Sequence, residues 1–157
     1  MQTGLLHLHN ILRWVILILL LVSLVKAFTG WRSGRPFSQG DAKLWLFTMI
    51  SAHLTLLVGL YQLLWGRYGV LVTDLPAGTS VMKDKFYRFF WIEHPVSMIL
   101  AIVFITMGRR MAKKNVPDDL KYKAAFYYFL LALILILIAV PWPFRDVAVA
   151  RPLLPGM

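Results

Sequence analysis

The stretch Ala124–Val140, AAFYYFLLALILILIAV, decides the fold class of this chain. It contains no charged residue, and Pro141-Trp142-Pro143 follows it directly. A helix needs about 20 mostly apolar residues to cross the hydrocarbon core of a bilayer, which is ~30 Å thick. Proline cannot continue a helix, so the helix is expected to end here. An open sheet would leave backbone groups unsatisfied in lipid. The stretch therefore predicts a membrane-spanning helix.

Three earlier stretches have the same apolar character, and together with the first they define four predicted spans. The spans cover about residues 5–28, 44–65, 89–108 and 124–140. The connections between them are too short to hold another domain. We therefore predict an all-α fold, an integral membrane four-helix bundle that forms a single transmembrane domain over residues 1–157.

The composition agrees with a protein that is surrounded mostly by lipid. Hydrophobic residues make up 59% of the 157 residues and charged residues 15%, whereas soluble domains have about 45–50% and about 25%. The chain has no cysteine, which excludes disulfides, thiolate-ligated iron–sulfur clusters, cysteine nucleophiles and c-type haem attachment. It also lacks a Ser-His-Asp set, a phosphate-binding glycine loop and an HExxH motif, which argues against hydrolase or kinase chemistry.

The net charge of +10 would suggest a nucleic-acid partner in a soluble protein, but topology accounts for it here. The first and third loops, with the adjoining helix ends, hold ten of the 17 Lys and Arg residues, and the opposite side holds seven. The positive-inside rule then places both termini and the middle loop outside. We expect a multi-pass protein of the bacterial inner membrane, with periplasmic termini and no nucleic-acid partner. No positive charge precedes the first span, so we expect a retained helix rather than a signal peptide.

The four histidines are the most informative polar residues, because all of them lie in or at predicted spans. They are His7, His9, His53 and His94. Polar side chains in a span are costly and mark functional sites. His9 and Arg13 lie four residues apart and share a face of the first span, whereas His7 points about 200° away from His9.

Imidazoles from facing helices in a dry bundle suit haem b. Its iron takes two neutral imidazole nitrogens on opposite faces, and four-helix bundles are natural hosts for it. We assign His94 as one axial ligand. The second is His9, judged by depth, or His53, judged by its position in mid-span, and His7 is a reserve. Arg13 would neutralise a propionate.

Three other interpretations stay open at this point. His9, His53, His94 and Glu93 could hold a bare transition metal. Glu93 and His94 could form a proton or quinone site, and Glu93 could also orient an imidazole. In the third, the chain is a cofactor-free accessory or assembly subunit of a larger membrane complex, and its polar residues only hold helices together.

Four short motifs resemble a known family. They are His7-Leu8-His9-Asn10, Ala52-His53, Glu93-His94-Pro95 and Pro141-Trp142. The pattern resembles small four-helix membrane proteins of Bacteroidetes-type bacteria labelled cytochrome b and, more remotely, cytochrome b561-type proteins. The resemblance implies haem b held by histidines of facing helices, and electron exchange with quinone or with subunits of a respiratory complex. The fourth span has no histidine, which departs from b561-type patterns, so we expect at most one haem.

Overall fold

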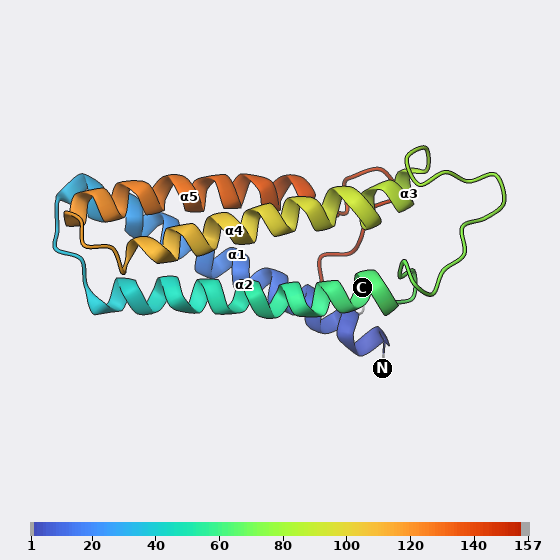
Figure 1. Cartoon of the computed structure of the whole chain (residues 1–157), viewed down its shortest axis with the longest axis horizontal. Coiled ribbons are helices and arrows are strands. Elements are labelled where there is room, and N and C mark those ends of the chain that lie inside the picture. The colour runs from blue at the N-terminus through green and yellow to red at the C-terminus, as the bar shows by residue number, and fades with distance from the viewer. Residues whose placement is uncertain (1, 155–157) are drawn as a thin grey trace.

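The computed structural model describes residues 2–154 and is helical along most of that length (Figure 1). Helices α1 (Gln2–Ser33) and α2 (Gln39–Trp65) lead into a long loop. A continuous helical stretch follows, made of α3 (Lys85–Arg88), a π-helical turn η1 (Phe89–Glu93) and α4 (His94–Met111). Helix α5 (Asp118–Ala139) completes the bundle. The described residues contain no strand.

The prediction of four spanning helices is confirmed in its coarse form. Within residues 2–154, four helical stretches are long and apolar enough to cross a membrane: 3–33, 39–65, 85–111 and 118–139. The helices begin or end up to two turns beyond most of the predicted limits. The additional turns carry charged residues such as Arg32, Asp41 and Lys121, which apolar runs do not reveal.

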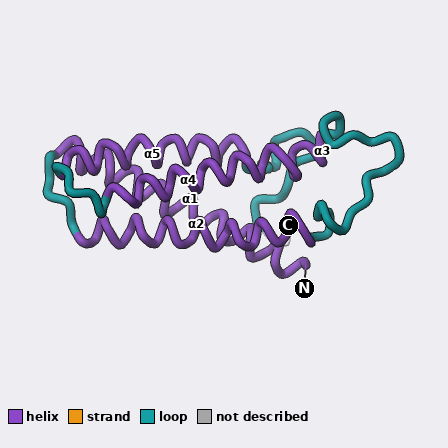
Figure 2. Tube along the Cα trace, viewed as in Figure 1, coloured by secondary structure: helices purple, strands orange, loops and turns teal. Residues whose placement is uncertain are grey.

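The bundle has two different ends (Figure 2). The short-loop end holds residues 34–38 and 112–117, which connect neighbouring helices tightly. The long-loop end holds residues 66–84 and the segment that follows α5, residues 140–154. This C-terminal segment runs back over the long-loop end toward α1 and α2 (Figure 1).

Small residues set the spacing of the helices in the core. A Cβ at Gly108 of α4 would collide with the Phe129 ring of α5, and one at Gly30 of α1 would lie 2.6 Å from the Tyr122 ring. Close packing of this kind is how helices associate when lipid removes the hydrophobic driving force between them. Ser23 of α1 and Thr48 of α2 also share a buried 2.8 Å hydrogen bond.

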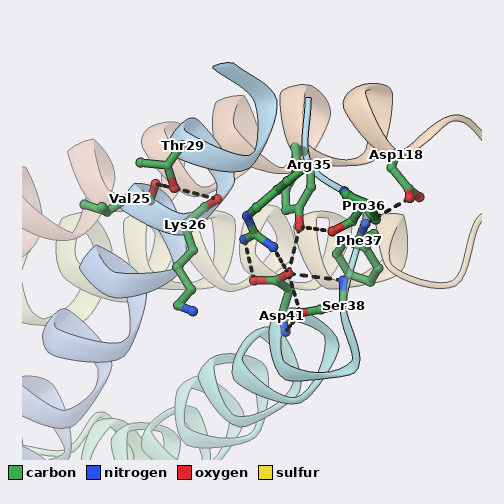
Figure 3. Close-up of polar contacts among 10 residues, drawn as sticks. Val25, Lys26, Thr29, Arg35, Pro36, Phe37, Ser38, Asp41 and Asp118 are labelled. Atoms are coloured by element: carbon green, nitrogen blue, oxygen red, sulfur yellow. Dashed lines mark hydrogen bonds and ion pairs between the residues drawn. The ribbon is translucent and has the colours of Figure 1, made fainter. Parts of the chain in front are cut away.

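A buried carboxylate fastens the short-loop end (Figure 3). Asp41 accepts two hydrogen bonds from the Arg35 guanidinium, at 2.7 and 2.9 Å, and one from the Tyr122 hydroxyl at 2.7 Å. Ser38 and Asp41 also form a capping box at the start of α2, which satisfies backbone donors that a helix start leaves free. The hydrogen bonds to Asp41 raise the pKa of the Arg35 guanidinium above its ordinary value. These contacts of Arg35, Ser38 and Tyr122 with Asp41, here called the Asp41 cluster, join the α1–α2 loop to α5.

Candidate functional site

A cavity of about 790 Å³ lies in the half of the bundle nearest the long-loop end. Small-molecule and cofactor sites measure about 300–1,000 Å³, so it is large enough for a sizeable ligand. Its walls come from α1, α2, η1 and α4, with the end of α5 and the C-terminal segment closing it. Most of the lining is apolar or aromatic; the lining histidines and arginines are His7, His9, Arg13, Arg67, His94 and Arg151.

His9 of α1 and His94 of α4 both line this cavity, and their rings form an edge-on pair. Their ring centroids lie 6.3 Å apart, and the ring planes differ by 67°. Two imidazoles that bind one metal ion from opposite sides, with metal–nitrogen bonds of ~2.0–2.1 Å, place their ring centres about 6 Å apart. The structure thus brings His94 together with His9, one of the two partners that the sequence left open.

Pro95 explains how His94 comes to face inward. Proline lacks the N–H that would bond to the carbonyl four residues earlier, at Trp91. The chain forms the π-helical turn η1 immediately before it, and the His94 N–H bonds to the Phe89 carbonyl five residues back. Such π turns are frequent at functional sites. The turn shifts the register of the helix at the residue that enters the cavity.

The His94 ring is held in a defined tautomer by α5. Its Nδ1 lies 2.8 Å from the Ala139 carbonyl oxygen, and a carbonyl only accepts, so Nδ1 carries the proton. Nε2 is then the nitrogen with a free lone pair. The Phe89 ring packs beside the imidazole, with the centroids 6.0 Å apart. A metal-binding histidine commonly has its other nitrogen bonded to a carbonyl in this way.

His9 lies against the small-residue stripe of α2. A Cβ at Gly59 would lie 3.2 Å from His9 Cε1, so only glycine leaves full room for the ring. The ring is also close to the Thr55 carbonyl. Its buried Nδ1 nevertheless makes no hydrogen bond of normal geometry within the described residues. An imidazole with an unsatisfied buried nitrogen is suited to a ligand that supplies the missing bond.

Arg13 lies one turn further along α1 from His9 and is 8% exposed. Its Nη2 donates to the Leu153 carbonyl at 2.5 Å, and its guanidinium carbon lies 5.4 Å from the centre of the Trp14 ring. Its Nε has no hydrogen-bond partner in residues 2–154. Arg13 thus lines the same cavity as His9 and His94, and its guanidinium group points toward the C-terminal segment.

The remaining candidate residues occupy different places. His7 lines the cavity, and its buried Nδ1 has no partner among the described residues. His53 is exposed on the outside of α2, and its Nδ1 lies 2.8 Å from the Met49 carbonyl of its own helix. The structure therefore does not bring His53 to the histidine pair. The mid-span position of His53 suggested that its side chain is buried. Burial depends, however, on which face of the helix a residue occupies, and Ala52 and Thr55 occupy the face that lines the cavity.

Glu93 is exposed and forms an ion pair with Arg88, with 2.8 Å between Oε1 and Nε. The expected role of Glu93 in orienting an imidazole is taken, for His94, by the Ala139 carbonyl. No group of three or more His, Asp or Glu side chains gathers at metal-binding distance in residues 2–154. A bare-metal centre built from His9, His53, His94 and Glu93 is therefore not assembled here.

The C-terminal segment contributes to the cavity, which the apolar spans of the sequence do not predict. Arg151, Pro152 and Leu154 line the cavity, although they lie beyond the last span. Their sequence, with two prolines near an arginine, resembles an ordinary tail. Only the packing of Arg151 against Phe86 and Phe90 of the third helical stretch reveals its place.

Comparison with protein-family models, with curated proteins and with solved structures finds no match for this chain. The assignment of a function therefore rests on the residues of the cavity and on their geometry.

Proposed function

We propose that this chain is a haem b-binding membrane protein that carries electrons, in which His9 and His94 would hold the haem. The observation that carries the proposal is the pair of imidazoles, 6.3 Å apart between ring centroids. The rings come from two different helices and meet in one cavity.

The chemistry of the donor set supports this ligand. Two neutral imidazoles are the ligands of many b-type haems, and an apolar shell favours them over water. The backbone of α5 fixes the His94 tautomer, and Gly59 leaves space for the His9 ring. A bound haem would supply one-electron transfer. The chain would hold the two imidazoles in place, exclude water and provide Arg13 as a cation for a haem propionate.

The proposal places the bundle in the bacterial inner membrane, with lipid as its solvent and both termini on the periplasmic side. The four apolar helices support insertion, and the excess of Lys and Arg at the short-loop end supports this orientation. Quinone or other subunits of a respiratory complex are the proposed electron partners.

The test is the haem content of the purified full-length protein in detergent. The pyridine haemochrome assay should give one haem b per chain, because His9 and His94 are the one pair of histidine rings in contact among the described residues. The oxidised protein should show a Soret band that shifts and sharpens on reduction.

A different result would favour one of the other interpretations. A colourless preparation that stays colourless after haem is added would contradict the proposal and favour a cofactor-free accessory subunit. A stoichiometric transition metal without a Soret band, found by elemental analysis, would favour a bare-metal site. These three outcomes are distinguished on the same sample.

A further inference from the structure

The charges that line the cavity are all of one sign. Three arginines, Arg13, Arg67 and Arg151, contribute to its walls, and no Asp or Glu is among the lining residues. A cleft with low-dielectric walls and charges of one sign focuses its field on a ligand of the opposite charge. Buried charges without a partner are also costly. The lining therefore favours an occupant that carries negative charge.

Arg13 and Arg151 are the two members of this set that are withdrawn from solvent without a carboxylate. Arg13 donates to a neutral carbonyl. Arg151 lies over two neighbouring aromatic rings, with its guanidinium carbon 5.5 Å from the centre of Phe86 and 4.7 Å from that of Phe90. Neither forms an ion pair with a carboxylate in residues 2–154. Burial lowers the pKa of the Arg151 guanidinium, so its surroundings disfavour the charge that it carries.

Two other cations at the same end, Lys85 and Arg88, already contact carboxylates. Lys85 contacts Asp146 at 2.6 Å, and Arg88 contacts Glu93 at 2.8 Å. Neither of them lines the cavity. Arg13 and Arg151, by contrast, line the cavity, are withdrawn from solvent and contact no carboxylate of residues 2–154.

The two guanidinium groups are linked through the C-terminal segment. The Leu153 carbonyl, two residues after Arg151, accepts hydrogen bonds from Arg13 Nη2 at 2.5 Å and from Trp14 Nε1 at 2.9 Å. Two donors from α1 thus converge on one oxygen at the mouth of the cavity. An oxygen of an acidic ligand would satisfy the same donors with a charge-assisted bond, which is stronger than a bond to a neutral carbonyl.

We propose that Arg13 and Arg151 form an anion subsite at the mouth of the cavity, which binds the carboxylates of the cavity's occupant. The Leu153 carbonyl holds the place of one carboxylate oxygen. This inference rests on the proposed function: for haem b, the acidic groups are the two propionates, and Arg151 is the second cation. The subsite also sets which edge of the ligand faces the long-loop end.

Lys83 provides a matched control, because it is an exposed cation of the same long loop and is not among the residues that line the cavity. The experiment titrates haemin and haemin dimethyl ester into full-length protein purified from haem-depleted cells. The ester keeps the ring and the iron but has no negative carboxylates. The wild-type protein should bind haemin at least about tenfold more tightly than the ester, since each charge-assisted pair is worth that much.

The variants Arg13→Gln and Arg151→Gln should each reduce this preference several-fold by weakening haemin binding, while ester binding stays the same. Lys83→Gln should keep the full preference, and Arg151→Lys, which keeps the charge, should keep most of it. The acid–ester comparison on the wild type needs no variant, so a folding defect in one of them does not remove the test.

Equal affinity of the wild-type protein for haemin and its ester would overturn the anion subsite and leave the proposed function intact. An unchanged preference in both Gln variants would also overturn it. Binding of neither compound by the wild type would overturn the proposed function, and the subsite with it.

Discussion

The Nδ1 atom of His94 donates to the carbonyl of Ala139, the last residue of α5, across 2.8 Å. This carbonyl is free because it lies in the last turn of α5, where the carbonyls of a helix have no intrahelical partner. The Leu137 carbonyl of the same turn would pair with Pro141, which has no N–H, and it accepts instead from Trp142 Nε1 at 2.8 Å. The end of the last helix thus supplies an acceptor that orients the proposed ligand His94.

Replacing Pro95 by Ala should impair the site without unfolding the bundle. Alanine restores the N–H at position 95, so the π-helical turn loses its cause and an α-helical register becomes available. His94 would then rotate away from His9. We expect haem content to fall several-fold while the helical circular dichroism stays the same. A haem content equal to that of the wild type would show that the turn does not position His94.

A side chain at position 59 should displace His9. In Gly59→Val the added carbons meet the ring at about the 3.2 Å already given for Cβ. Haem affinity should drop by roughly tenfold or more, because a misplaced axial ligand loses its bond to the metal. Gly4→Val is the control, since nothing lies within 4 Å of a Cβ at Gly4. Equal affinity in the two variants would contradict the placement of His9.

Asp41 should matter for stability and not for the cavity. Asp41→Asn removes the charge that accepts from Arg35 and Tyr122, and loss of one member of a buried ion pair costs roughly 2–4 kcal/mol here, because Arg35 is partly exposed. Unfolding in mixed micelles would measure this loss of unfolding free energy. The matched variant Asp119→Asn, at an exposed position of the same end, should change the free energy of unfolding little. A similar loss in both variants would refute the role of the Asp41 cluster.

The hydrogen bond between Ser23 and Thr48 should contribute less to the free energy of unfolding than the contacts of Asp41 do. Interhelical hydrogen bonds of this type contribute about 0.6 kcal/mol on average in membrane proteins. Ser23→Ala should therefore lower the unfolding free energy by about that amount, well below the effect of Asp41→Asn. A loss as large as that of Asp41→Asn would show that the α1–α2 contact depends on this pair far more than its geometry suggests.

The number and type of the helices followed from the apolar runs, because lipid leaves few other ways to satisfy the backbone. The sequence left the partner of His94 open between His9 and His53, and the structure places the His9 ring beside it. His53 shows what depth along a span leaves undecided. Its ring points outward because of the rotation of α2 about its own axis, and the sequence alone does not determine that rotation. The places of Arg151 beside Phe86 and Phe90 and of Tyr122 beside Asp41 were out of reach because these partners are distant in sequence.

The central claim is that His9 and His94 hold one shared group, and the visible absorption spectra of three alanine variants test it most directly. The variants His9→Ala and His94→Ala should each lose the six-coordinate, low-spin spectrum of the wild type. His53→Ala should keep it, since that ring lies outside the cavity. A normal spectrum in either of the first two, or its loss in His53→Ala, would contradict the account.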